Sequence, residues 1–316
     1  MRILLTNDDG IDAPGIRALH SALMGLDPIS RARFGGPIGG ADTEVYTVAP
    51  LTVQSATSHG VTFHTPLMVE PVSHLDGYAV DGRPADCVKV ALSALWPERF
   101  GEGSRPDLVI SGMNAGANCG VNVIYSGTVA AAIEAAFLGP PSLAVSMHLG
   151  RGRPLFDVGA MHARRAIEKI IETKSLGQHE CLSINIPRCE EFLPDTPEGR
   201  EEMRRARAGA GSPGQPASAQ AYDHGPDVND EHDPLAPMPI SVCPMNTHGL
   251  IDRFEKRVSP AGQAYYWSAA GGLDFHRTEP GTDVDLLFKR HITVTPLSFD
   301  LTATDSLRHW QSKLST

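Results

Sequence analysis

Hydrophobic and polar positions alternate along the first part of the chain in blocks that predict strands and helices in turn. Short apolar runs that end at turn-forming residues are typical of buried strands, whereas apolar residues three or four positions apart are typical of helices. Residues 16–26 show the helical spacing, with Ile16, Leu19 and Leu23 on one side. The pattern predicts strands at 2–6, 44–49, 108–111, 142–147 and 181–186, and helices at 16–26, 86–95, 128–138 and 158–174.

Strands separated by helices indicate right-handed βαβ units and a mainly parallel sheet, so the predicted fold class is α/β. We expect an α/β core at residues 1–187, with a surface-loop insertion at 27–42 and an extended or hairpin segment at 61–71. Residues 204–239 are poor in large apolar side chains, which predicts a flexible insertion within about 188–240. The remaining stretch, 241–316, is expected to complete the fold, with strands at 264–268 and 284–296 and a helix at 306–313.

Composition excludes several classes of function and site. The formal net charge of −10 leaves no basic field for duplex nucleic acid, although a metal or a helix terminus could still attract a small anion. The five cysteines are scattered without a CxxC pair, which argues against a zinc site or a disulfide framework. No apolar run approaches the roughly 18 residues that span a bilayer. We therefore expect a cytoplasmic protein with buried thiols and no membrane contact.

Candidate chemistry begins directly after the first predicted strand, at Asn7-Asp8-Asp9-Gly10. Open α/β sheets bind ligands at the carboxyl ends of their strands. Adjacent carboxylates repel each other unless a cation or a proton neutralises them, and oxygen ligands favour hard cations such as Mg²⁺ or Mn²⁺. The pair predicts a metal-dependent enzyme; the alternative is a polar turn in which Asp9 or Asp12 caps a helix.

Three further loops follow neighbouring strands or open a helix at the same predicted edge. Residues 54–59 offer hydroxyl oxygens, and residues 111–118 combine small residues with the amides of Asn114 and Asn118. The Ser/Gly/Thr turn at 126–128 opens an alanine-rich helix and can seat a phosphate on its N–H groups. Each loop alone could be an ordinary turn or cap, but together they favour a metal-plus-phosphate site.

Two other polar residues have open roles. His59 is a candidate general acid, although a lone loop histidine is more often a polar surface residue. Asp283, in a Gly-Thr-Asp turn, could line a site or could serve a turn or an interface.

Longer stretches of the chain resemble the SurE family of survival-protein nucleotidases. The resemblance spans nearly the whole chain outside the two insertions. It is carried by ILLTNDDGIDAPGI at the N-terminus, DGRPADCV from Asp81, PDLVISGMNAGANCG from Pro106, VIYSGTVAAAIEAAFLG from Val123 and PGTDVDLLFKRHITVTPLSFDLTA from Pro280. The resemblance implies a Rossmann-like core with a C-terminal β-rich extension that mediates homodimers or homotetramers. It also implies hydrolysis of nucleoside 5′-monophosphates, and possibly of 3′-monophosphates, with one divalent cation per subunit.

Carried over to this sequence, the resemblance implies four metal ligands and a set of phosphate-binding residues. Asp8 or Asp9 would be the general base that activates water, and the sequence leaves open which of them acts. The implied metal ligands are Asp8, Asp9, Ser55 and Asn114, and the implied phosphate-binding residues are Asn118, Ser126, Gly127 and Thr128.

The chain departs from the family pattern in the second loop. The usual pattern resembles APDRNRSG, whereas here the residues from Ala49 read APLTVQSA, so Ala56 replaces the glycine that follows the serine. Arg83 stands where threonine is usual, and Asn122 where aspartate is usual. These positions border the expected pocket and therefore bear on nucleotide preference.

Three other functions compete with the nucleotidase interpretation. A haloacid-dehalogenase phosphatase needs Asp two residues after its nucleophile, and Gly10 occupies that position. A dinucleotide-binding module needs GxGxxG after the first strand, where this chain has NDDGIDAPG. A non-catalytic nucleotide-binding protein of the same fold is the remaining alternative, which the altered second loop motivates.

Overall fold

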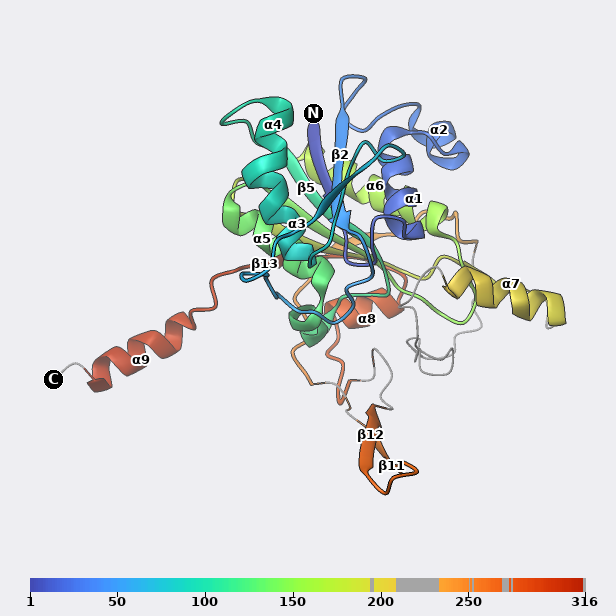
Figure 1. Cartoon of the computed structure of the whole chain (residues 1–316), viewed down its shortest axis with the longest axis vertical. Helices are drawn as coiled ribbons and strands as arrows, with labels where there is room; N and C mark the ends of the chain where they lie inside the picture. The colour runs from blue at the N-terminus through green and yellow to red at the C-terminus, as the bar shows by residue number, and fades with distance from the viewer. Residues whose placement is uncertain are drawn as a thin grey trace.

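Nine strands form one sheet within the part of the chain that the computed structural model describes (Figure 1). The described residues are 1–193, 196–208, 233–249, 251, 253–268, 273 and 275–314. The strands of this sheet are β1 (Arg2–Thr6), β2 (Glu44–Pro50), β3 (Val69–Val72), β4 (Gly77–Val80), β5 (Leu108–Ala115), β6 (Ser142–Met147), β8 (Cys181–Ile186), β10 (Ile240–Val242) and β13 (Ile292–Leu297). Their spatial order is β10-β13-β8-β6-β5-β1-β2-β4-β3, with β1 at the centre between β5 and β2.

The sheet is mainly parallel, as predicted. β1 pairs in parallel with both neighbours, so that Ile3 lies opposite Val45 on one side and Leu108 on the other. Within this sheet, as far as the structure describes it, two neighbouring pairs are antiparallel: β3 with β4 and β13 with β8. The carboxyl ends of β1, β2, β5 and β6 consequently meet at one edge of the sheet.

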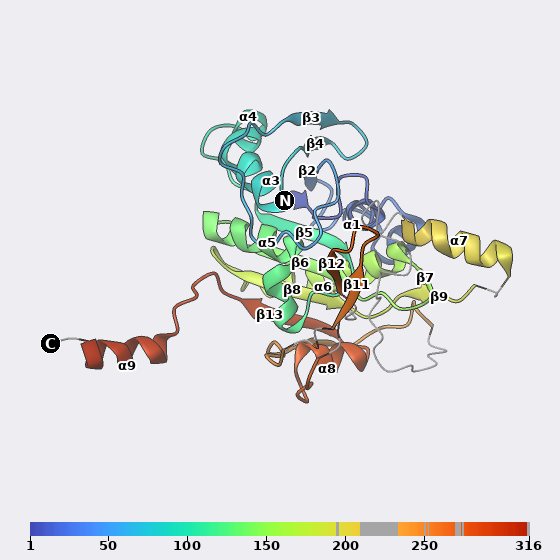
Figure 2. The ribbon, with the colours of Figure 1, turned by 60° about the horizontal axis from the view of Figure 1, so that its bottom comes forward.

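Helices cover both faces of the sheet (Figure 2). Ile3 and Leu5 pack with residues of α1 and α6, whereas the intervening Leu4 packs with residues of α3 and α5. This alternation follows from the two-residue period of a strand, and it makes the central strands apolar on both faces. The helices are α1 (Pro14–Met24), α2 (Pro28–Phe34), α3 (Pro84–Val90), α4 (Trp96–Phe100), α5 (Gly127–Leu138), α6 (Phe156–Glu172), α7 (Pro197–Ala208), α8 (Asp283–Phe288) and α9 (Thr304–Leu314), with a π-helical segment at Ala91–Leu95 and a 3-10 helix at Gly120–Tyr125.

The structure corrects three predicted elements. The 27–42 insertion contains α2, whose N-terminus is capped by the Asp27 side chain accepting from the Ser30 N–H at 2.8 Å. The predicted strand at 284–296 is instead α8 followed by β13, because Val284 and Leu287 are buried at helical spacing. Within 61–71 only the end is a strand, β3, and it pairs with β4, which the pattern did not predict.

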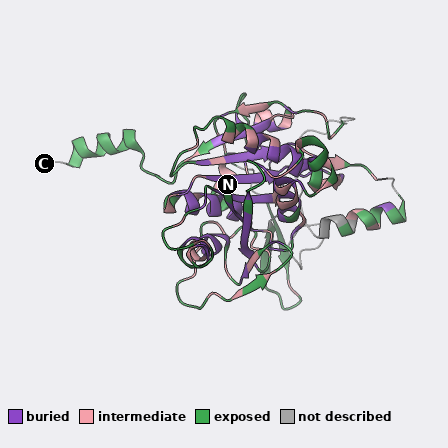
Figure 3. Cartoon of the chain, turned by 90° about the horizontal axis from the view of Figure 1, so that it is seen from above, coloured by how far each residue is buried: buried purple, intermediate pink, exposed green. Residues whose placement is uncertain are grey.

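The C-terminal part contains two exposed elements. The hairpin of β11 (Phe254–Val258) and β12 (Ala264–Ser268) and the helix α9 project from the body of the molecule (Figures 1 and 2). Figure 3 shows α9 as exposed, in contrast to the buried central strands, and no residue of this helix is buried within its described range. Two further short strands, β7 (Arg153–Pro154) and β9 (Glu190–Glu191), pair with each other.

Three other expectations can be compared with the structure. The predicted flexible insertion at 204–239 lies mostly outside the described residues, although its first residues belong to α7. All five cysteines are buried and none forms a disulfide, as expected. Among the described residues, no helix combines the length and the apolar character needed to cross a membrane.

Candidate active site

Asp8 and Asp9 lie at the carboxyl end of β1, in the middle of the sheet. Asp8 is buried, and its Oδ1 accepts a hydrogen bond from the Thr128 hydroxyl at the start of α5. Asp9 is half-buried, and its Oδ2 accepts from the Ala115 backbone N–H at 2.9 Å at the end of β5. Two segments more than a hundred residues away in sequence therefore orient the two carboxylates.

The electrostatics of the pair favour neutralisation. Burial raises the pKa of Asp8, although hydrogen bonds from Thr128 and Gly127 counteract part of this effect. Burial, together with the neighbouring charge of Asp8, raises the pKa of Asp9 well above its ordinary value. Two ionised carboxylates in this position are unfavourable without a compensating positive charge, which is the condition that a bound cation satisfies.

The amino-terminal end of α5 faces this pair. Ser126 caps the helix, since its Oγ accepts from the Val129 N–H at 3.1 Å. A Cβ on Gly127 would lie 2.8 Å from the Cβ of Asp8 and 2.9 Å from its Oδ2, so only glycine allows this approach. The positive end of the helix dipole is thus held beside the carboxylates, and the backbone N–H groups of Gly127 and Thr128 donate to Asp8.

The loop after β5 approaches the pair from the other side. The Asn114 Nδ2 donates to the Gly116 carbonyl at 2.7 Å, which fixes the plane of its amide next to the residue that contacts Asp9. Asn118 faces a different direction: its Nδ2 donates to Ser146 Oγ at 2.9 Å, and its backbone N–H donates to Asn185 Oδ1 at 2.8 Å. The structure therefore brings Asn114 to the acidic pair and places Asn118 against β6 and β8.

The loop after β2 completes the arrangement. The Gln54 N–H donates to the Asp8 carbonyl at 2.7 Å. Ser55 is the next residue after Gln54, so this hydrogen bond holds the backbone before Ser55 against the acidic pair. Ser55 itself is exposed, and Ala56 follows it with a left-handed φ of 55°. The segments that carry Ser55 and Asn114 thus both contact the acidic pair, through Gln54 and Ala115.

The donor set fits a hard divalent cation. Carboxylate, amide and hydroxyl oxygens from Asp8, Asp9, Asn114 and Ser55 are the donors that Mg²⁺ and Mn²⁺ prefer. Within the described residues, no three His, Cys, Asp or Glu side chains gather as a metal site. The Asn7 Oδ1 beside the pair is buried and lacks a hydrogen-bond partner among the described residues.

His59 and Asp283 have partners outside the acidic pair. The His59 Nε2 lies 2.7 Å from Glu134 Oε2. Asp283 is buried and accepts from the N–H groups of Gly120 and Asn246, both at 2.8 Å, so it ties α8 to the segment before α5. Glu134 was not among the predicted site residues, although it is the lone charged residue of an otherwise apolar, alanine-rich helix, and that signal could have identified it.

Comparisons with known proteins agree with this architecture. The family described as "Survival protein SurE" matches residues 3–207. The chain is 36% identical to a 5′-nucleotidase SurE of Desulforudis audaxviator, covering 98% of this chain and 97% of that protein, and 36% identical to one of Rhodopirellula baltica, covering 97% and 96%. The crystal structure of the SurE protein from Aquifex aeolicus aligns with a TM-score of 0.65 at 28% identity, covering 99% of both chains.

Proposed function

The chain belongs to the SurE family, and from that premise we propose that it is a divalent-metal-dependent 5′-nucleotidase that hydrolyses nucleoside 5′-monophosphates to nucleoside and phosphate. The observation that carries the proposal is the contact between the acidic pair and the start of α5, where the Thr128 hydroxyl donates to Asp8. A cation site and an anion site are thereby adjacent, which is what a phosphate ester and its metal require together.

The four oxygen-bearing residues would hold the cation, namely Asp8, Asp9, Ser55 and Asn114. When bound, a divalent cation neutralises the carboxylates, polarises a phosphate oxygen and acidifies a water molecule. Ser126 would hold a non-bridging phosphate oxygen through its hydroxyl, with the helix dipole opposing the growing negative charge. The donors of Gly127 and Thr128 contact Asp8, so they would orient this carboxylate beside the phosphate. Asn118, whose amide is engaged with Ser146, would act by holding the 114–118 loop in place.

We assign the general base to Asp9. It is half-buried whereas Asp8 is buried, so Asp9 is the carboxylate that water can reach. The Asp8 oxygen that faces α5 is already occupied by the Thr128 hydroxyl.

The test is phosphate release from AMP and from an aryl phosphate, in EDTA, in Mg²⁺ and in Mn²⁺. Turnover that requires a metal and prefers AMP supports a nucleotidase; equal turnover of both substrates indicates a general phosphomonoesterase. A folded sample that releases no phosphate with either metal contradicts the proposal and supports a non-catalytic binding protein.

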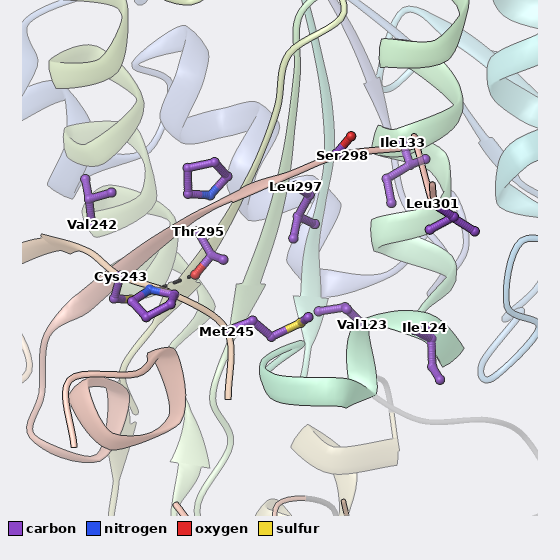
Figure 4. Close-up of a pocket in the computed structure, with 12 residues that line it drawn as sticks. Val123, Ile124, Ile133, Val242, Cys243, Met245, Thr295, Leu297, Ser298 and Leu301 are labelled. Atoms are coloured by element: carbon purple, nitrogen blue, oxygen red, sulfur yellow. Dashed lines mark hydrogen bonds between the residues drawn. The ribbon is translucent and has the colours of Figure 1, made fainter. Parts of the chain in front are cut away.

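We also propose that the chain forms a homo-oligomer through its C-terminal segment. A groove of about 690 Å³ is lined mostly by apolar side chains, including Val123, Ile133 and Leu297, and by Leu301 on the way to α9 (Figure 4). α9 exposes Leu307, Trp310 and Leu314, with side-chain surface that nothing in the described part of its own chain covers. Exposed apolar surface of this kind marks interaction sites, and the occupant that we propose is the C-terminal segment of a second copy.

The oligomer proposal is tested by light scattering on the whole chain and on a variant that ends at residue 303. A dimer or larger assembly that becomes a monomer on truncation supports the proposal. A monomeric whole chain, or an assembly that truncation leaves intact, contradicts it.

A further inference from the structure

The loop that carries Ser55 has an unfavourable backbone conformation. Ala56 and Ser58 have φ values of 55° and 52°, in the left-handed region that residues with a side chain rarely adopt. Such conformations persist only when surrounding contacts hold them. The position of Ser55 therefore depends on what anchors the loop at residues 51–62.

The two ends of this loop are anchored differently. On the side of Asp8, the Gln54 N–H donates to the Asp8 carbonyl, which is a backbone contact available to any residue. On the far side the Ser58 N–H donates to the Tyr125 carbonyl at 3.2 Å, and side chains add to this anchor: Ser58 Oγ donates to the Ile124 carbonyl at 2.7 Å, and His59 Nε2 contacts Glu134 Oε2 at 2.7 Å. At the end of the loop, the Thr62 N–H and hydroxyl donate to the Asp86 carboxylate at 2.8 and 2.7 Å. The far side therefore depends in part on residue identity, through the side chains of Ser58, His59 and Thr62.

Glu134 provides His59 with a mostly buried hydrogen-bond acceptor. Its carboxylate is only 8% exposed, and its second oxygen accepts from Lys89 Nζ of α3 at 3.0 Å. The hydrogen bond from His59 is the largest of the effects that keep the pKa of Glu134 low, so the carboxylate is charged at neutral pH. A buried charge with two donors strongly resists losing either of them.

The same helix also sets the position of the acidic pair. α5 contacts Asp8 through Thr128 in its first turn and His59 through Glu134 further along. His59, Glu134 and Ser126 also line one cavity of about 450 Å³, so the anchor lies beside the proposed phosphate seat. A displacement of the loop relative to α5 would therefore change the distance between Ser55 and the carboxylates.

We propose that His59 and Glu134 are a positioning pair that holds the 51–62 loop on α5 and thereby presents Ser55 to the cation at Asp8 and Asp9. His59 is thus assigned to positioning and not to proton transfer. The consequence for metal binding rests on the proposed function, whereas the anchoring of the loop does not.

The experiment compares His59→Ala, His59→Gln and Glu134→Gln with the wild type and with His248→Ala. His248 is the matched control because it pairs with Glu279 at 3.0 Å, a similar histidine–glutamate contact on a different part of the chain. Three quantities are measured: Mn²⁺ affinity by electron paramagnetic resonance, amide hydrogen exchange of residues 51–62, and kcat and KM for AMP. Mn²⁺ affinity and exchange are readouts that do not depend on turnover.

We expect His59→Ala to weaken Mn²⁺ binding on the order of 10-fold, the loss typical of residues that orient metal ligands. Exchange should rise within 51–62 while the melting temperature and the exchange of the central strands stay close to the wild type. His59→Gln should restore most of the affinity, because glutamine can still donate to Glu134. Glu134→Gln should resemble His59→Ala, and His248→Ala should resemble the wild type.

Wild-type Mn²⁺ affinity and wild-type exchange in His59→Ala would overturn the proposal. A second pattern would also overturn it: a loss of kcat in His59→Gln as large as that in His59→Ala, with the 51–62 loop protected from exchange as in the wild type. That pattern indicates proton transfer. A wild type without metal binding or turnover would refute the proposed function alone, because exchange in His59→Ala would still decide whether the pair anchors the loop.

Discussion

The two sides of the candidate active site are built by different means. The acidic pair is attached to the central strand, is buried or half-buried, and is oriented by Thr128 and by the backbone of Ala115. The residues of the 51–62 loop are exposed or half-buried, two of them are left-handed, and side chains provide part of its anchoring. The position of the two carboxylates is therefore set by the sheet itself, whereas the position of Ser55 depends on contacts that a single substitution can remove.

The first prediction tests the buried side by removing a charge. Asp9→Asn should reduce kcat/KM for AMP by more than ~100-fold, because it deletes a proposed metal ligand and the general base at once. Asp12→Asn is the control, since Asp12 belongs to the same loop but is 75% exposed at its side chain and pairs with His74. Activity of Asp9→Asn within a few-fold of the wild type would exclude these roles.

The second prediction tests how closely α5 must approach the pair. Gly127→Ala should lower activity by roughly 10-fold or more and destabilise the fold by about 1–3 kcal/mol, as overpacking does in tight sites. Its new Cβ would lie 2.8 Å from the Asp8 Cβ. Gly36→Ala, where nothing lies within 4 Å, should change neither quantity. Calorimetry measures the stability of the two variants, and phosphate release measures their activity. Wild-type stability and activity in Gly127→Ala would mean that α5 can move away from Asp8 at no cost to either.

The third prediction concerns the pH dependence of stability without metal. The pKa of Asp8 and of Asp9 is raised in the folded state, so folding favours their protonated forms. The contribution of this pair to stability in EDTA should be fully present below the ordinary carboxyl pKa, and should be lost as pH rises through the raised pKa values. Melting curves from acidic to neutral pH should show a smaller decline in Asp9→Asn, and Mn²⁺ should restore the wild type at neutral pH. A decline of equal size in both proteins would place its origin elsewhere.

The smallest predicted effect belongs to the loop. Ala56→Gly should change stability by less than about 1 kcal/mol and in the favourable direction, because glycine adopts a left-handed φ without steric cost. Ala41→Gly, at an exposed turn position without a left-handed φ, should instead lower stability by a few tenths of a kcal/mol to about 1 kcal/mol. Chemical denaturation measures both, and equal losses in the two variants would show that Ala56 is not strained.

Much of the sheet was predictable because its strands are locally encoded. Apolar runs bounded by turn formers located residues 2–6, 142–147 and 181–186 with the bounds that the structure has. Errors arose where a short run suited two structures: 284–296 contains both α8 and β13, and only the burial of Val284 and Leu287 at helical spacing separates them. The short strand β4, next to the edge strand β3, was missed because it is four residues long.

The sequence by itself determined the order of strands and helices and the placement of Asp8 and Asp9 at a strand end, because hydrophobic periodicity and turn residues act over short distances along the chain. Only the tertiary structure decided that α5 joins the acidic pair to the loop, because His59 and Glu134 are 75 residues apart and meet only when the sheet topology places their segments together. It also decided which apolar residues stay exposed. The spacing of Leu307, Trp310 and Leu314 is typical of the buried side of a helix, yet all three are exposed in the described chain.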